Sequence, residues 1–472
     1  MDWFTADGYG LSRLVFQRGL AAIYLVAFLA AARQFRPLLG SRGMLPIPAF
    51  VAQVPFRRAP SVFHAHYSDR FFAGCAWTGC AVALALLAGA DGELPLWGAL
   101  LLWALPWALY VSIVNVGQTW YGFGWESLLL EVGFLAIWLG NGRVGPPIVL
   151  LFLLRWALFR VEFGAGLIKI RGDACWRRLT CLDYHHETQP MPGPLSWLFH
   201  RLPRPLHRVE VAANHVTQLI VPVLLFTPQP VASVAAALMI VTQLWLVASG
   251  NFAWLNWITI VVALAALDLS PIAGERTQPA APAWYEAVVL AVTALILVLS
   301  WRPARNLFSR RQLMNYSFDP LHLVNTYGAF GSVSRVRQEV VVEGTAEAVP
   351  RSDDDWQAYE FKGKPGDPRR WPRQFAPYHL RLDWMMWFAG LSPAYARSWF
   401  GGLLERLLEG DRDTLRLLHR SPFPADRPPR LVRARLYRYR FTTPAELRAT
   451  GACWERTFVR EYWPPTRLDT GP

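Results

Sequence analysis

Long apolar runs constrain the fold of this chain more than any other feature of its sequence. Runs long enough to cross a bilayer, about 17–25 residues each, occur at 14–32, 71–90, 96–116, 123–140, 146–170, 209–227, 231–249, 252–269 and 283–301. The chain is 53% hydrophobic and only 17% charged over 472 residues, which is too apolar for a soluble protein of this size. The sequence therefore predicts a polytopic α-helical membrane protein with about nine spans. The first run could instead be a signal peptide, but the acidic start MDWFTADGYG favours a retained helix.

Arginine placement predicts the orientation of the chain in the membrane. The segments 33–70 and 171–208 and the stretch after 301 are rich in arginine, and nine spans would place all three on one side. The positive-inside rule then puts the N-terminus outside and the C-terminal domain in the cytoplasm. Nearly all of the 47 basic residues are arginines, which hints at a GC-rich bacterial genome. The expected location is a bacterial inner membrane, or the endoplasmic reticulum membrane if the source is eukaryotic.

The sequence divides into two expected domains. A helical membrane domain covers 1–301, including the loop 171–208, a basic connector covers 302–315, and a small α+β domain covers 316–472. Residues 302–472 hold 28 Lys+Arg and 19 Asp+Glu, a net charge of +9 out of +13 for the whole chain. A basic domain attached to a membrane most often lies against anionic headgroups, so the lipid bilayer is an expected partner. Nucleic acid is not expected, because the sequence has no recognition motif.

Alternating residues and Pro/Gly-rich turns predict the elements of the C-terminal domain. Strands are expected at 333–343, 356–362 and 431–441, and helices near 381–390 and 398–420. The alternation in the last strand places one set of side chains on one face, namely Arg433, Arg435, Tyr437, Tyr439 and Phe441. A half-exposed sheet surface explains this face more simply than a binding site does.

Charged residues in the fifth apolar run are the strongest indication of a functional site. Arg155, Glu162 and Lys169 are spaced by seven. Seven residues are nearly two helical turns, with a drift of about 20°, so the three side chains share one stripe. Because a charge in hydrocarbon is costly unless it is paired or hydrated, this stripe should face the interior of a bundle. Glu131 in the preceding run needs a cationic partner for the same reason, and Arg155 or Arg160 is the nearest in sequence.

Lys169 has two interpretations that the residues alone leave open. Its position near the helix end allows the ammonium to reach the headgroups, which would make it a structural lysine. Alternatively, an apolar setting disfavours the charged form and makes the amine a general base or nucleophile, with Glu162 and Arg155 as further catalytic candidates. Gly164 and Gly166 would allow another helix or a ligand to approach the backbone closely.

The loop 171–208 is long for a membrane-protein connection and contains many aromatic residues. We expect it to fold onto the helix ends or to lie in the membrane interface. Together with Arg160 and Glu131 it supplies the candidate binding residues Trp176, Tyr184, His185, His186 and Glu187. Interfacial anchoring explains Trp176 more simply, and interfacial hydrogen bonding explains the histidines more simply. No recognised zinc spacing is present, so neither a metal nor another cofactor is predicted.

Two further groups of side chains carry predictions. Cys175 and Cys181 could form a disulfide in an oxidising compartment, but in a cytoplasmic loop they should be free thiols. Asn214, His215 and Gln218 lie on consecutive turns of the sixth apolar run. Polar residues with this spacing in a membrane helix are more often hydrogen-bonding groups between helices than a reaction centre.

Several motifs resemble the lipase maturation factor family. They are LLGSRGMLP at 38–46, FGWESLLLE at 123–131, the block 155–203 with FGAGLIKIRGD and CWRRLTCLDYHHETQPMP, NTYGAFGSV at 325–333, YEFKGKPGDP at 359–368, APYHLRLDWMMWFA at 376–389 and RARLYRYRF at 433–441. A shorter pattern, Phe163, Ala165, Gly166, Leu167, Ile168 and Lys169, is similar to the membrane domain of vitamin K-dependent γ-carboxylase. In that family the corresponding lysine is a catalytic base.

The first resemblance implies a multi-span factor that assists dimeric lipases to reach an active folded state. It also implies that the loops and the C-terminal domain face the lumen in eukaryotes, which conflicts with the arginine placement. The sequence therefore predicts a membrane-bound maturation factor with client proteins such as lipases. The alternative is a membrane enzyme that uses Lys169 as a base on a quinone or lipid-like substrate. A pocket open to lipid beside Lys169 would favour the alternative.

Overall fold

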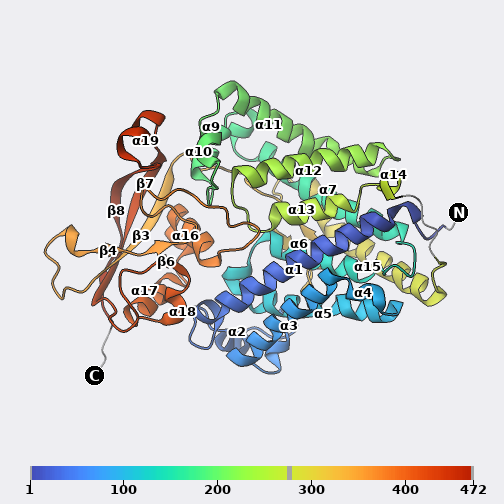
Figure 1. The fold of residues 1–472 in the computed structure, drawn as a ribbon, viewed down its shortest axis with the longest axis horizontal. Coiled ribbons are helices and arrows are strands. Elements are labelled where there is room, and N and C mark those ends of the chain that lie inside the picture. The colour runs from blue at the N-terminus through green and yellow to red at the C-terminus, as the bar shows by residue number, and fades with distance from the viewer. Residues whose placement is uncertain (1–2, 274–278, 469–472) are drawn as a thin grey trace.

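The structure, a computed structural model, describes residues 3–273 and 279–468, so that the outermost ends of the two expected domains and the segment 274–278 lie outside it. All nine expected apolar runs lie on helices (Figure 1). These helices are α1 Gly10–Leu39, α3 Asp69–Ala88, α5 Leu96–Val116, α6 Gly124–Ile137, α7 Ile148–Arg171, α11 Arg204–Leu219 with its extension to Phe226, α12 Val231–Ser249, α13 Leu255–Leu264 and α15 Ala283–Phe308. Shorter helices between them are α2 Ile47–Gln53, α4 Ala90–Glu93 and α14 Ser270–Ala273.

Six of these helices in the described ranges are long and apolar enough to cross a membrane: α1, α3, α5, α11 with its extension, α12 and α15. The structure thus confirms a polytopic helical membrane protein, while the count of nine spans stays a prediction. Helix α7 has 24 residues but carries five charged side chains. Helices α6 and α13 have 14 and 10 residues and are too short to cross a bilayer unaided.

Helix α6 lies inside the bundle. Nearly every one of its side chains is buried, as expected for a helix that is apolar all round. Helix α13 packs between α1, α7 and α12. Figure 1 shows both near the middle of the molecule, with longer helices on either side. Gly133 of α6 lies so close to the Tyr24 ring of α1 that a Cβ atom would clash with the phenol.

The loop 171–208 folds onto the helix ends, as predicted. It contains three short helices, α8 Ala174–Arg177, α9 Leu182–Thr188 and α10 Ser196–His200. Pro192 pairs with Gly250 at the end of α12, and the Trp197 indole donates to the Thr442 carbonyl at 2.9 Å. The loop therefore lies between the helix ends and the C-terminal domain.

The C-terminal domain contains the expected small α+β unit. Its main sheet is antiparallel, with the order β4 Gln357–Ala358, β3 Arg337–Thr345, β7 Leu431–Phe441 and β8 Trp454–Thr466. Strand β7 has the predicted bounds, whereas β8 was not predicted. Two-residue and three-residue strands complete the domain: β1 Tyr316–Ser317, β2 Asn325–Thr326, β5 Glu360–Phe361 and β6 Leu418–Arg420. Its helices are α16 Arg381–Leu391, α17 Phe400–Leu408, α18 Arg412–Leu415 and α19 Pro444–Thr450.

The prediction of a half-exposed face on 431–441 is wrong. Arg433, Tyr437, Tyr439 and Phe441 are all buried, and only Arg435 is partly exposed. Arg433 forms an ion pair with Glu343 at 2.8 Å, and the Phe441 ring stacks on Trp454 with centroids 3.9 Å apart. Trp454 at the start of β8 and the segment before β4, with Asp353 and Trp356, pack on this face, and neither contact was expected from the sequence.

One hydrophobic core joins the two domains. It runs without interruption from α1 and α6 to β3, α16 and α17 in the C-terminal domain. The Arg381 guanidinium reaches back to the Glu126 carboxylate of α6 at 2.7 Å. The C-terminal domain is therefore packed onto one end of the bundle (Figure 1).

Candidate functional site

Helix α7 turns its charged stripe inward, as the seven-residue spacing predicted. Arg155, Glu162 and Lys169 are 6%, 0% and 5% exposed. The three do not share one centre. The Arg155 guanidinium donates to the Leu225 carbonyl at 3.2 Å and to the Tyr9 hydroxyl at 2.7 Å, away from the other two. The candidate site therefore centres on Glu162 and Lys169.

Lys169 is held by uncharged acceptors. Its ammonium donates to Asn214 Oδ1 at 2.7 Å and to Gln218 Oε1 at 2.9 Å, both on α11. The Trp176 ring lies over the same ammonium at 4.9 Å. Among the described residues no carboxylate lies within 4.0 Å of Lys169. The prediction that Asn214 and Gln218 make hydrogen bonds between helices is confirmed.

Glu162 is the centre of a hydrogen-bonded chain that crosses four helices. The amide of Gln218 donates to Glu162 Oε2 at 3.1 Å, so it links Glu162 to Lys169. On the other side, Gln243 of α12 donates to Glu162 Oε1 at 2.7 Å. Asn256 of α13 in turn donates to Gln243 Oε1 at 2.7 Å. The carboxylate thus receives amide donors on both oxygens, which satisfies a buried charge without a direct cationic contact.

The chain from Lys169 to Asn256 forms one wall of a large cavity of about 790 Å³. Aromatic side chains form much of the remaining lining, including Trp176, Phe252, Tyr327, Phe330, Trp384 and Trp387. Leu206 and Val209 of α11 and Val241 of α12 also line the cavity and are more than half exposed. This indicates a mouth between two helices that could span the membrane. A volume of this size lies within the range of small-molecule sites, about 300–1,000 Å³.

Glu131 and Arg160 form a buried ion pair, as predicted, between α6 and α7. Arg160 also donates to the Asn325 carbonyl at 2.6 Å. Glu131 accepts the Tyr327 hydroxyl at 2.7 Å and the Asn325 backbone N–H at 2.9 Å. Neither charged residue lines the cavity. They instead hold the segment after β1 against the bundle, behind the cavity wall formed by Tyr327.

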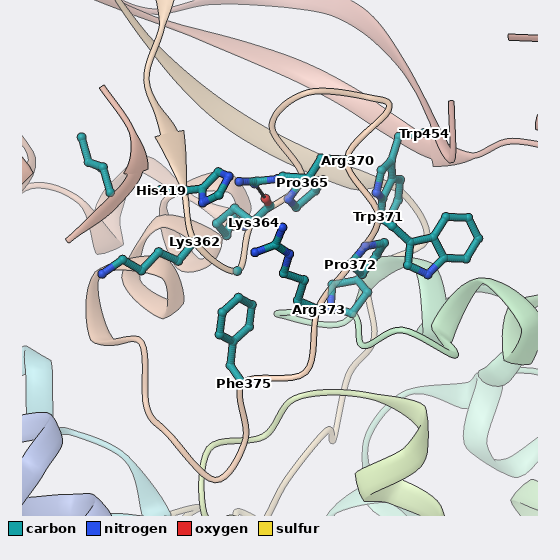
Figure 2. Close-up of a pocket in the computed structure, with 13 residues that line it drawn as sticks. Lys362, Lys364, Pro365, Arg370, Trp371, Pro372, Arg373, Phe375, His419 and Trp454 are labelled. Carbon is teal, nitrogen blue, oxygen red and sulfur yellow. Dashed lines mark hydrogen bonds between the residues drawn. The ribbon is translucent and has the colours of Figure 1, made fainter. Parts of the chain in front are cut away.

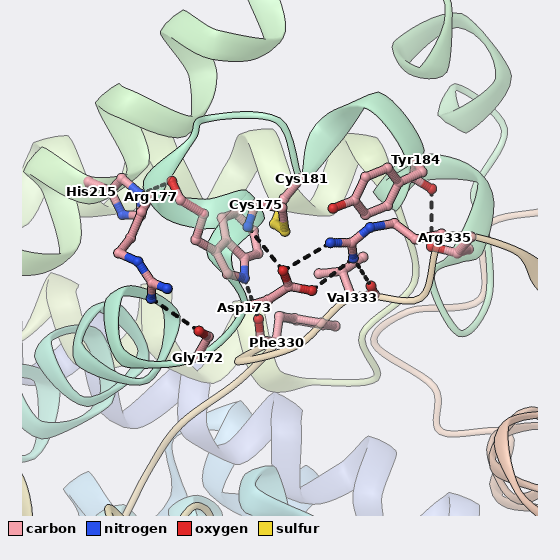
Figure 3. The surroundings of a disulfide bond; sticks show 12 residues. Gly172, Asp173, Cys175, Arg177, Cys181, Tyr184, His215, Phe330, Val333 and Arg335 are labelled. Carbon is pink, nitrogen blue, oxygen red and sulfur yellow. Dashed lines mark hydrogen bonds and ion pairs between the residues drawn. A yellow bond between two sulfur atoms is a disulfide. The ribbon is translucent and has the colours of Figure 1, made fainter. Parts of the chain in front are cut away.

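The residues around α8 form a compact, cross-linked turn (Figure 3). Cys175 and Cys181 form a disulfide, so the expectation of free thiols is wrong. Asp173 accepts two hydrogen bonds from Arg335, which hold the pKa of that carboxyl well below its usual range. The Trp176 indole donates to the Phe330 carbonyl at 2.7 Å. These contacts fix Trp176 over the Lys169 ammonium.

The candidate binding residues of α9 separate into two groups. His185 and His186 are buried and line the cavity. Burial, and secondarily the charge of Lys169, lower the pKa of His185 to about 3, so its imidazole is neutral at physiological pH. Tyr184 instead contacts the Arg335 guanidinium at 4.4 Å. Glu187 accepts the Phe441 backbone N–H at 2.7 Å and so joins the loop to the sheet.

Sequence reasoning missed Gln243, Asn256 and the pair formed by Glu126 and Arg381. Gln243 and Asn256 are single amides in otherwise apolar runs, which is the signal that could have indicated them. Arg381 lies within the motif APYHLRLDWMMWFA, and its guanidinium also lies over the Tyr121 ring at 3.4 Å. Within 3–273 and 279–468, no three His, Cys, Asp or Glu side chains gather as a metal site would require.

Fold and site together define a polytopic helical membrane protein with a polar-walled cavity and a C-terminal α+β domain packed on the bundle. The lipase maturation factor transmembrane domain matches residues 11–273, and the lipase maturation factor C-terminal domain matches residues 323–464. The chain belongs to the lipase maturation factor family.

Known relatives match along nearly the whole chain. Lipase maturation factor 1 of Bos taurus is 41% identical, over 98% of this chain and 90% of the relative. Lipase maturation factor 1 of Homo sapiens is 40% identical, over 98% and 88%. Lipase maturation factor 2 of Homo sapiens is 27% identical, over 98% and 83%. No solved structure matches the chain.

Proposed function

We propose that this integral membrane protein assists the maturation of lipases. The observation that carries the proposal is the 41% identity to lipase maturation factor 1, which covers 98% of this chain. The division proposed from the sequence, with a membrane domain at 1–301, a connector at 302–315 and a C-terminal domain at 316–472, agrees with the separate matches at 11–273 and 323–464. We assign client contact to the region 155–203 and the C-terminal domain.

Lipase activity measures this function directly. The full chain is expressed together with a lipase in cells that lack their own maturation factor. The expected result is an increase in active lipase with no change in total lipase. If active lipase does not increase although the protein inserts correctly, the proposed function is wrong.

The cavity beside Lys169 favours a second candidate function, the binding of a lipid-like molecule within the membrane domain. Such a pocket was expected for the membrane-enzyme alternative, which the relatives do not support, so we propose binding alone. A catalytic role for Lys169, Glu162 and Arg155 stays a prediction. Of these residues, Glu162 and Lys169 line the space.

A Lys169→Met variant tests whether the cavity contributes to maturation. Methionine preserves much of the side-chain volume but cannot donate to Asn214 or Gln218. The matched control is Arg171→Gln, because Arg171, two residues further along α7, makes an exposed contact to Gln312 at 2.8 Å. If active lipase is lost only with Lys169→Met, and thermal stability is unchanged, the cavity contributes to maturation. If both variants yield as much active lipase as wild type, a contribution of Lys169 to maturation is excluded.

We further propose that the loop 171–208 and the C-terminal domain face an oxidising compartment. The disulfide between Cys175 and Cys181 supports this orientation, because disulfides persist in such compartments and are rare in the cytosol. The arginine placement supports the opposite orientation. Thiol alkylation of intact and permeabilised cells, with and without reductant, decides between them. The test uses a chain in which the free cysteines Cys75, Cys80 and Cys453 are replaced by serine. Labelling of Cys175 or Cys181 without reductant would then contradict the proposal.

A further inference from the structure

A second, smaller pocket lies between the loop 171–208 and the C-terminal domain, apart from the cavity beside Lys169. Its volume is about 260 Å³, which is slightly below the usual range for drug-sized ligands and suits a compact group. Figure 2 shows the side chains of Arg370, Arg373 and His419 gathered around one space. Trp371 and Phe375 contribute aromatic walls.

The pocket is lined by two lysines, two arginines and a histidine, and by no aspartate or glutamate. Arg370 contacts the Glu360 carboxylate at 3.3 Å. In contrast, no described carboxylate lies within 4.0 Å of Arg373 or His419. Burial, and then the nearby charges of Arg370 and Arg373, lower the pKa of His419. An anion in the space would relieve the repulsion between Arg370 and Arg373 and would accept a hydrogen bond from the His419 imidazole.

A buried cation behind the pocket holds its floor in place. Lys364 is 4% exposed and forms an ion pair with Glu339 at 2.7 Å. Its backbone carbonyl accepts a hydrogen bond from Arg370. The Arg370 guanidinium also donates to the Phe361 carbonyl at 2.8 Å. Arg370 is therefore oriented before any ligand arrives, which reduces the entropy lost on binding.

The pocket lies beside the end of a helix that could cross the membrane. Asn251 lies two residues after the end of α12, and its side-chain amide nitrogen donates to the Arg373 carbonyl at 2.9 Å. Asn251 Oδ1 accepts hydrogen bonds from the backbone N–H groups of Phe375 and Ala376 at 2.7 and 2.8 Å. The segment that carries Arg373 is thus fixed beside the end of α12, and the end of a helix that crosses a membrane lies where lipid headgroups begin.

We propose that this pocket binds a phosphomonoester, with Arg370, Arg373 and His419 contacting the phosphate oxygens. Guanidinium groups suit phosphate because they donate two parallel hydrogen bonds. A phosphomonoester carries about −1.5 to −2 charges at neutral pH, which matches the surplus of positive charge better than a carboxylate does. The position beside α12 favours the headgroup of a membrane lipid as the source. The proposal does not rest on lipase maturation.

Calorimetric titration of the full chain in neutral detergent tests this site. The probes are inorganic phosphate, glycerol 3-phosphate, dihexanoyl phosphatidic acid and dihexanoyl phosphatidylcholine. We expect the three phosphomonoester-type probes to bind, and the zwitterionic diester to bind at least tenfold more weakly. If phosphatidic acid binds at least tenfold more tightly than glycerol 3-phosphate, the source is a lipid headgroup. Equal affinities would support the site with a soluble phosphate ester as the source.

Three variants separate specific binding from general charge. Arg373→Gln and His419→Gln should each weaken phosphate binding at least tenfold, because each removes a charge-assisted contact. The matched control is Arg369→Gln, which removes an exposed arginine of the same segment that does not line the pocket. Three outcomes would overturn the proposal. The three variants weaken phosphate binding equally, Arg373→Gln has no effect, or the wild-type protein binds none of the probes at millimolar concentrations.

Discussion

The Glu131 carboxylate shows how a single buried charge is made tolerable in this bundle. It receives hydrogen bonds from Arg160, Asn325 and Tyr327, and it is 1% exposed. Arg160 is equally buried, so the pair is removed from solvent as a unit. Losing one partner of such a pair leaves an uncompensated charge, which costs far more than the pair itself contributes.

Replacing Arg160 with methionine should therefore destabilise the protein severely. We expect a loss of about 3–5 kcal/mol in the free energy of unfolding, measured by denaturant titration in detergent. As a control, Arg416→Gln breaks an exposed pair with Asp413 at 2.9 Å and should cost less than about 1 kcal/mol. Similar small losses in both variants would show that Glu131 does not depend on Arg160.

Asp383 in the C-terminal domain gives a prediction that depends on pH. Burial raises the pKa of its carboxyl from 3.8 to about 6. A hydrogen bond from the Gly363 N–H at 2.6 Å lowers the pKa but does not outweigh burial. The folded state holds this proton more tightly than the unfolded state. The resulting stabilisation is complete below about pH 4 and is lost as the pH rises through 6.

An Asp383→Asn variant keeps an acceptor for the Gly363 N–H but cannot titrate. Relative to wild type, it should gain stability between pH 4 and pH 7, by about 3 kcal/mol at most. Unfolding free energies measured at several pH values in that interval provide the test. Parallel curves for the two proteins would contradict the raised pKa.

At the scale of elements, helix α7 depends on close backbone approach at Gly164. A Cβ atom at Gly164 would lie 2.5 Å from the Tyr327 carbonyl oxygen. At Gly166 it would meet side-chain atoms of Leu219 and Gln218 on α11 at 2.8 and 3.0 Å. The close approach of another helix, expected from the sequence, occurs at Gly166, whereas the neighbour at Gly164 is the backbone of Tyr327 after β2. One of these neighbours carries Gln218, which links Lys169 to Glu162.

Gly164→Ala should destabilise the protein although alanine is the better helix former. The clash is with backbone, which cannot move aside as a side chain can, and overpacking of this kind costs about 1–3 kcal/mol. The matched control is Gly401→Ala in α17, where a Cβ atom would meet nothing within 4 Å. That change should stabilise by up to about 1 kcal/mol through helix propensity. Thermal unfolding measures the change in stability in each variant. If both variants are stabilised, the backbone of Tyr327 does not approach Gly164 as closely as described.

Across the whole molecule, the two domains should unfold together. The Glu126 carboxylate of α6 depends on Arg381 of α16 at 2.7 Å, and the hydrophobic core continues across the same boundary. Calorimetry should show one transition, which Arg381→Met moves as a whole to lower temperature. In the control, Arg435→Gln alters an exposed ion pair with Asp353 within the sheet region and should change the transition little. Two separate transitions would mean that the domains are independent.

The sequence by itself determined where the helices lie, that α7 turns its charges inward, and that residues 431–441 form a strand. Hydropathy and periodicity are local properties, and each segment carries enough of them to specify its own conformation. The need to neutralise Glu131 limited its expected partner to Arg155 or Arg160 on the next helix, and the structure pairs it with Arg160.

Only the tertiary structure decided which distant groups meet. Gln243 of α12 reaches Glu162, and Asn256 of α13 reaches Gln243. The Trp454 ring packs on a face of β7 that the alternation alone left half exposed. The same packing opens a cavity beside Lys169 and joins the two domains through Arg381. The physical reason is that hydrogen bonds and close packing depend on distances between segments far apart in the chain, which no local pattern records.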